Sequence, residues 1–180
     1  MTCITEYFSI AQAICHVYSL PFAFTRLEKI TNQFPDVLFN TVTYLCANDV
    51  ILMKRDFFRR VSQCFPSLKY FVIINHGLIL PTCLVLKVNE NTSSSIIEYP
   101  KLISLDIRRV DIEIVMQFLL ETNTHLPRLT ELLINYEQLK IATMNFTNDA
   151  TRCNCEKVQQ LILVGIQSIQ EDVYTYFPLL

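Results

Sequence analysis

The sequence predicts an α/β fold in which strand–helix units stack side by side, giving one parallel concave sheet with helices on its convex side. Three observations support this prediction. A proline-containing phrase recurs along the chain, one apolar pattern recurs with it, and helical periodicity fills the segments between. With 180 residues, of which 51% are hydrophobic, the chain can bury the core that one such domain needs.

The recurring phrase is an aromatic residue or leucine, then proline, then any residue, then an apolar residue. Each copy is expected to open a strand, because self-similarity along a sequence indicates a repeat architecture. A looser copy lies at Phe34–Val37, and the copy at the end of the sequence predicts the beginning of one more unit. The four good copies are Phe65–Leu68, Tyr99–Leu102, Leu126–Leu129 and Phe177–Leu180.

Apolar residues occupy positions one, four and six of each expected strand. The strand starts are 26, 34, 27 and 29 residues apart, mostly near the ~20 to 29 residues of leucine-rich repeats. We therefore predict a leucine-rich-repeat solenoid with an N-terminal capping segment over residues 1–36, about five irregular repeats over 37–180, and an insertion near 78–99. The pattern comprises Val42, Leu45 and Ala47; Leu68, Phe71 and Ile73; Leu102, Leu105 and Ile107; Leu129, Leu132 and Ile134; and Val158, Leu161 and Leu163.

Helical periodicity lies between the expected strands. Met53–Phe65 and Ile112–Leu126 each place apolar residues on one helical face. Pro66 and Pro127 are expected to end these helices, because proline disfavours helical geometry in the residue before it. The alternative is an ordinary α/β domain. The repeated order of elements and the absence of a glycine-rich turn between strand and helix favour the solenoid.

The composition disfavours several classes of partner. The net charge of -2 comes from interspersed acidic and basic residues, so neither nucleic acid nor a membrane surface is an expected partner. Two glycines are too few for a phosphate-binding loop, and no cofactor is expected. Leu68–Leu86 is long enough to span a bilayer, but its polar residues and proline favour two short buried strands around a turn.

Cysteine usage indicates a reducing compartment. The seven cysteines are odd in number, scattered and mostly set in apolar runs, so a cytoplasmic or nuclear location is expected. Two glycosylation acceptor patterns, beginning at Asn91 and Asn145, instead favour a secreted protein. An extracellular recognition domain therefore stays open as an alternative.

No residue group predicts an enzyme or a metal site. Cys153 and Cys155 form one closely spaced pair, whereas tetrahedral zinc needs four ligands. The densest carboxylate group consists of Asp106, Asp111 and Glu113. It alternates with Arg108 and Arg109, which is typical of a solvated patch with balanced charge. We expect no catalytic residue and no metal ligand. A hydrolase with an unfamiliar site is a weaker alternative.

The predicted function is protein–protein interaction through the concave sheet face. Side chains alternate along a strand, so positions three, five and seven face away from a core formed by positions four and six. This face mixes tyrosines, apolar residues and charged residues, as protein-binding surfaces do. The alternative is that the N-terminal segment or the insertion covers it. The predicted contact residues are Tyr44, Asn48, Tyr70, Val72, Ile74, Asp106, Arg108, Glu131, Leu133 and Asn135.

Five stretches carry a resemblance to a known family: Tyr18–Phe22, Asp56–Val61, Ile96–Leu102, Gln117–Thr122 and Asn145–Arg152. They resemble the leucine-rich-repeat portions of F-box-like proteins that are expanded in some invertebrate lineages. The resemblance implies substrate recognition for ubiquitin transfer. No F-box segment is readable ahead of the repeats, so a cullin adaptor is an expected partner only if an F-box is present elsewhere. The ninth repeat position, commonly asparagine or cysteine in that family, holds other residues here, so a regular asparagine ladder is not expected.

Overall fold

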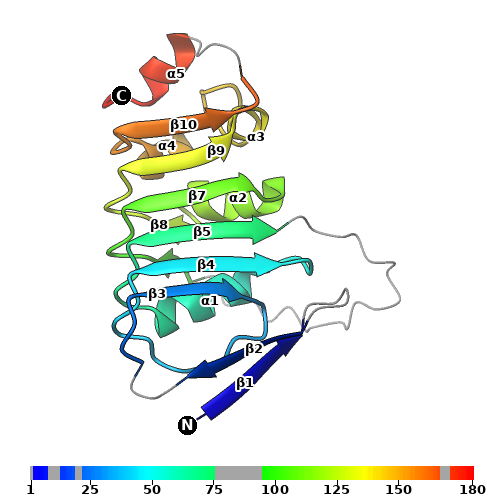
Figure 1. Cartoon of the computed structure of the whole chain (residues 1–180). Helices are drawn as coiled ribbons and strands as arrows, with labels where there is room; N and C mark the ends of the chain where they lie inside the picture. Colours follow the sequence, from blue (N-terminus) through cyan, green and yellow to red (C-terminus); the bar gives the residue numbers. More distant parts are fainter. Residues whose placement is uncertain (1, 8–12, 19–21, 76–94, 167–170) are drawn as a thin grey trace.

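The protein is α/β, with a six-stranded parallel sheet and helices packed against it (Figure 1). The computed structural model describes residues 2–7, 13–18, 22–75, 95–166 and 171–180, with side chains from Phe22 onward. The sheet order is β10-β9-β7-β5-β4-β3, so each strand lies beside the next along the chain. These strands are β3 (Arg26–Ile30), β4 (Tyr44–Asp49), β5 (Tyr70–Asn75), β7 (Ser104–Arg109), β9 (Glu131–Asn135) and β10 (Gln160–Val164).

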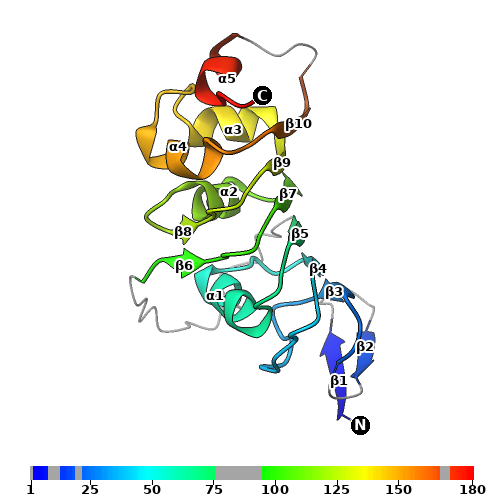
Figure 2. The same cartoon turned by 90° about the vertical axis from the view of Figure 1, so that its left-hand side faces the viewer.

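The helices lie on one side of this sheet, and the row of strands bends with its helix-free side on the inside of the curve (Figure 2). Two short parallel strands, β6 (Ile97–Glu98) and β8 (Thr124–His125), pair on the helix side, and β1 (Thr2–Tyr7) and β2 (Ala13–Tyr18) form an antiparallel pair. The helices are α1 (Arg55–Cys64), α2 (Ile112–Leu119), α3 (Tyr136–Ala142), α4 (Asp149–Cys155) and α5 (Glu171–Tyr176).

A hydrogen-bonded turn precedes each strand of the six-stranded sheet from β4 onward. In the turn before β5, the Leu68 amide donates to the Phe65 carbonyl at 3.1 Å. Proline suits such a turn because its fixed φ matches the first central position. The predicted phrase is thus a turn that redirects the chain from the helix layer into the sheet. The equivalent turns span Phe39–Val42, Tyr99–Leu102, Leu126–Leu129, Cys155–Val158 and Phe177–Leu180.

Each strand is joined to the preceding one at its first residue by a repeated backbone contact. The amides of Lys69 and Tyr70 both donate to the Thr43 carbonyl, at 2.8 and 2.9 Å. The amides of Gln159 and Gln160 make the same pair of bonds to Thr130. This contact fixes the register, so equivalent residues of neighbouring strands lie opposite one another.

The core lies between the sheet and the helices. Positions one, four and six are buried as predicted in β4, β5, β7 and β9, but Leu161 and Leu163 of β10 are only partly buried. Aromatic rings fill the helix side of the core. Phe118, for example, is fully buried, with its ring centroid 5.0 Å from that of Phe58 and 5.8 Å from that of Tyr99.

Buried polar side chains connect neighbouring units. The Asp49 carboxylate accepts bonds from the Asn32 side chain and from the Ile51 amide. The Asn75 side chain donates to the carbonyls of Asp49 and Ile51 and accepts from the Met53 amide. Polar residues therefore do form a short ladder here, at the eighth strand position rather than the ninth. The expectation that no regular asparagine ladder forms at the ninth position is not contradicted, because this short ladder includes an aspartate and lies at the eighth position.

Some predicted boundaries are wrong. The second helix ends at Leu119, not at Leu126, because its last carbonyls turn to the Asn154 side chain and the chain then enters β8. The looser phrase at Phe34–Val37 opens no strand. β3 lies inside the predicted capping segment. The first helix, predicted over Met53–Phe65, is shorter by two residues at its start and one at its end.

The structure describes only part of the apolar segment Leu68–Leu86. The first strand predicted within Leu68–Leu86 is β5, whereas the second, with most of the predicted insertion, lies outside the described residues. In the described part of the chain, no helix has the length and apolar character needed to cross a bilayer.

Candidate protein-binding surface

The candidate site is the side of the sheet opposite the helices, which we call the helix-free face. Side chains alternate in burial along β4, β5 and β9, so the less buried set points to this face. The structure places all ten predicted contact residues in this less buried set. Ser104 of β7 lies opposite Tyr70 and Glu131 in the strand register, but it is buried, with 8% exposure.

The strand register arranges the helix-free face into transverse rows. One row runs from Glu28 through Cys46, Val72, Asp106 and Leu133 to Ile162. Burial is the main cause that raises the pKa of the Cys46 thiol, which therefore stays neutral and acts as a small apolar group. From β4 to β10, this central row is consequently apolar except at Asp106.

Asp106 is held by its own strand. The Arg108 guanidinium contacts both carboxylate oxygens, with Nη2–Oδ2 at 2.7 Å and Nε–Oδ1 at 3.0 Å, and the Arg108 amide adds a 3.2 Å bond. The Asp106 side chain is 15% exposed, against 38% for Arg108. This bidentate pairing offsets the charge of the carboxylate and leaves the guanidinium partly exposed on the helix-free face.

A second row carries the aromatic groups. It runs through Arg26, Tyr44, Tyr70, Ser104 and Glu131, in register across the sheet. The Arg26 guanidinium lies 3.8 Å from the centroid of the Tyr44 ring and also pairs with Glu28 at 2.5 Å. Tyr70 is 43% exposed, although burial of a tyrosine ring away from water is energetically favourable. Tyr70 has the more exposed of the two tyrosine rings in this row.

The structure changes the sequence-based description of this face at three residues, Asn135, Arg26 and Glu28. The Asn135 side chain accepts bonds from the amides of Glu137 and Gln138 and so begins α3. It has a structural role in addition to any contact. Arg26 and Glu28 were not predicted as part of this face, because β3 lies within the predicted capping segment and its period of two is interrupted by a bulge at Lys29, whose φ is 60°.

The groups considered for chemistry are dispersed. Cys153 is exposed and Cys155 buried, and burial raises the pKa of Cys155 to about 12. Both are free, as are Cys46 and Cys64. His125 is exposed on β8. Across the side chains the structure describes, no three His, Cys, Asp or Glu residues gather as metal ligands would.

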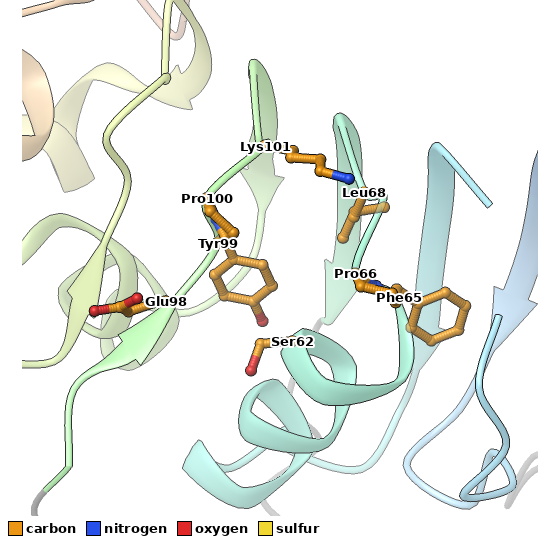
Figure 3. A pocket seen from close by; sticks show the side chains of 8 residues that line it. All are labelled: Ser62, Phe65, Pro66, Leu68, Glu98, Tyr99, Pro100 and Lys101. Atoms are coloured by element: carbon orange, nitrogen blue, oxygen red, sulfur yellow. The ribbon is translucent and has the colours of Figure 1, made fainter. Parts of the chain in front are cut away.

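A shallow pocket of 260 Å³ lies between the turns that precede β5 and β7 (Figure 3). Its hydroxyl groups already serve the fold. Ser62 donates to the Arg59 carbonyl at 2.9 Å, and the buried Tyr99 hydroxyl donates to the Phe58 carbonyl at 2.7 Å. Burial also raises the pKa of Tyr99 well above its usual value. The pocket therefore offers no activated nucleophile.

The chain was compared with known proteins. No protein-family model matches it, and neither the curated proteins nor the solved structures include a match.

Among the described residues, the helix-free face brings partly buried apolar side chains, the exposed Tyr70 ring and the Arg108 guanidinium onto one side of the sheet.

Proposed function

We propose that the chain is a leucine-rich-repeat module that binds a protein partner through its helix-free face. The repeat assignment is supported by the strand order, which follows the chain, and by the same turn and backbone contact before successive strands. Units that cannot bury their apolar side alone must stack in this way. Stacking leaves a broad, fixed sheet surface.

One observation carries the binding proposal. The central row is incompletely buried and is apolar at Val72, Leu133 and Ile162, with Asp106 between Val72 and Leu133 paired to Arg108. The exposed Tyr70 ring and the Arg108 guanidinium border this row. Interfaces typically have such an apolar centre with tyrosine and arginine anchors, because these residues lose water and pack at low entropic cost. An extended or flat protein surface fits a sheet face better than a small molecule, which needs a concave pocket.

The test compares three baits in affinity purification from cells of the source organism, read by mass spectrometry. One is the natural chain, and one carries Tyr70→Ala, Val72→Thr and Leu133→Thr on the helix-free face. Threonine is β-branched, a shape that strands favour, and it adds a hydroxyl group to the face. The third carries Ile141→Gln, which removes an exposed apolar group on the helix side that is 62% exposed.

The proposal expects proteins that the natural and Ile141 baits capture and that the triple variant loses. Equal capture by all three would contradict it, provided that circular dichroism shows the triple variant folded. A cullin adaptor among the specific partners would extend the function to substrate recognition for ubiquitin transfer, as the family resemblance implies.

A further inference from the structure

The turns that precede three successive strands carry a basic side chain at the same position. The third residue of the turn is Lys101 before β7, Arg128 before β9 and Lys157 before β10. Because these strands are neighbours in the sheet, the three turns follow one another along the edge where the strands begin (Figure 2). Neighbouring strands lie about 4.8 Å apart, so the cations of two adjacent turns can act on one ligand.

Lys157 differs from the other two cations because its charge is already used within the fold. Its amino group donates to the Pro127 carbonyl of the neighbouring turn at 3.3 Å. In the part of the chain that the structure describes, neither the Lys101 amino group nor the Arg128 guanidinium has a hydrogen bond or an ion pair. These two cations are therefore available to a ligand.

The pocket of 260 Å³ lies beside Lys101, between the turns before β5 and β7 (Figure 3). Its lining is largely apolar, with Pro66 and Pro100 from the two turns and the buried side chains of Phe65, Leu68 and Tyr99. Pockets that enclose whole small molecules measure about 300 to 1,000 Å³. This smaller and shallower pocket suits a single apolar side chain better than a cofactor.

The charges around the pocket favour an anion. In the three turns that lead into β5, β7 and β9, the basic side chains are Lys69, Lys101 and Arg128, and the acidic ones are Glu98 and Glu131. Glu131 belongs to the less buried set of β9 and so points to the helix-free face. Figure 3 shows the Lys101 side chain extending toward the turn before β5 and the Glu98 carboxylate extending the opposite way. The pocket thus has a cation on the side where it opens between the turns.

We propose that this pocket, together with Lys101 and Arg128, binds a short acidic segment of a protein partner. A large apolar side chain of the segment enters the pocket between Pro66 and Pro100, and an aspartate or glutamate close to it in sequence pairs with the two cations. Both contacts are needed, because an exposed ion pair contributes at most about 1 kcal/mol. The site lies at the edge where the strands begin, so it is separate from the helix-free face and does not rest on the proposed function.

The test selects phage-displayed random peptides of twelve residues on the full natural chain and reads them by sequencing. The proposal expects enriched peptides in which a large apolar residue lies close to aspartate or glutamate. Two variants identify the peptides that use this site. Lys101→Glu reverses the charge, and Ser62→Leu fills the pocket from α1 without changing the charge. Each should weaken binding of such a peptide about fivefold or more in fluorescence anisotropy.

Lys157→Gln is the matched control, because it removes a cation from the same turn position but does not line the pocket. It should change peptide binding less than about twofold, since salt screens charges at that separation. The helix-free-face triple variant should bind the peptides normally, which separates this site from the proposed function. Circular dichroism checks that each variant is folded.

The proposal is overturned if no enriched peptide loses affinity for both Lys101→Glu and Ser62→Leu, or if the peptides that do so lack acidic residues. A single-stranded oligodeoxythymidine probe distinguishes the other anionic macromolecule. Its binding to the natural chain with the same dependence on Lys101, and its displacement of the peptides, would make nucleic acid the occupant and overturn the assignment to a protein segment.

Discussion

Asn154 should be among the residues that contribute most to stability, although it is polar. Its side chain is 1% exposed and lies within α4, beneath the end of α2. The oxygen accepts from the Leu126 amide at 3.0 Å. The nitrogen donates to the carbonyls of Thr124 at 2.7 Å, Phe118 at 3.1 Å and Leu119 at 3.3 Å. One side chain thus satisfies the end of a helix, a short strand and the next turn.

Asn154→Ala should lower the free energy of unfolding by about 3 to 5 kcal/mol. The Leu126 amide and the Thr124 carbonyl would each lose a short bond, and an unsatisfied buried group costs about 1 to 3 kcal/mol. Urea denaturation followed by circular dichroism measures the change. Cys153→Ala, on the exposed side of the same helix, is the matched control and should change stability by less than about 0.5 kcal/mol. A loss below about 1 kcal/mol for Asn154→Ala would refute the reasoning.

Three further predictions concern stability. Asn75→Ala should cost about 2 to 3 kcal/mol in urea denaturation, because the Met53 amide and the Asp49 carbonyl lose their partner; a neutral result would show that the polar ladder is dispensable. Phe118→Ala should cost about 3 to 5 kcal/mol in the same assay, since it empties the space between three aromatic rings. The stability of the fold should depend on pH through Cys155, because burial raises the pKa of its thiol from 9.0 to about 12. Between these values the unfolded chain releases a proton that the folded chain keeps, so the free energy of unfolding should fall as pH rises. Cys155→Ala should flatten that fall, and an unchanged slope would count against a buried thiol.

Much of the sheet could be predicted because its signals are local. Leu105 and Ile107 alternate with less apolar residues after a proline turn, and this pattern fixes both the strand and its buried face. β3 was harder to predict because Leu27 and Ile30 are spaced across a bulge, which breaks the period of two. The end of α2 depends on Asn154, which lies 35 residues away from Leu119 in the sequence. No local window contains that contact.

The sequence predicts which residues lie on the candidate site, but not how their side chains pair. The outward positions follow from strand alternation, so Tyr70 and Val72 were placed correctly on the helix-free face. The capping role of Asn135 and the pairing of Asp106 with Arg108 depend on side-chain geometry that alternation does not specify. The pocket between the turns before β5 and β7 required the whole strand order, because it depends on which turns become neighbours.

The most direct test of the central claim is site-specific photo-crosslinking to a partner recovered with the natural bait. A photoreactive phenylalanine analogue would replace Tyr70 on the helix-free face in one protein and Ile141 on the helix side in another, both positions being exposed. The proposed function expects a crosslink from position 70 and none from position 141. A crosslink from position 141 alone would show that the partner binds the helix side and would contradict the account.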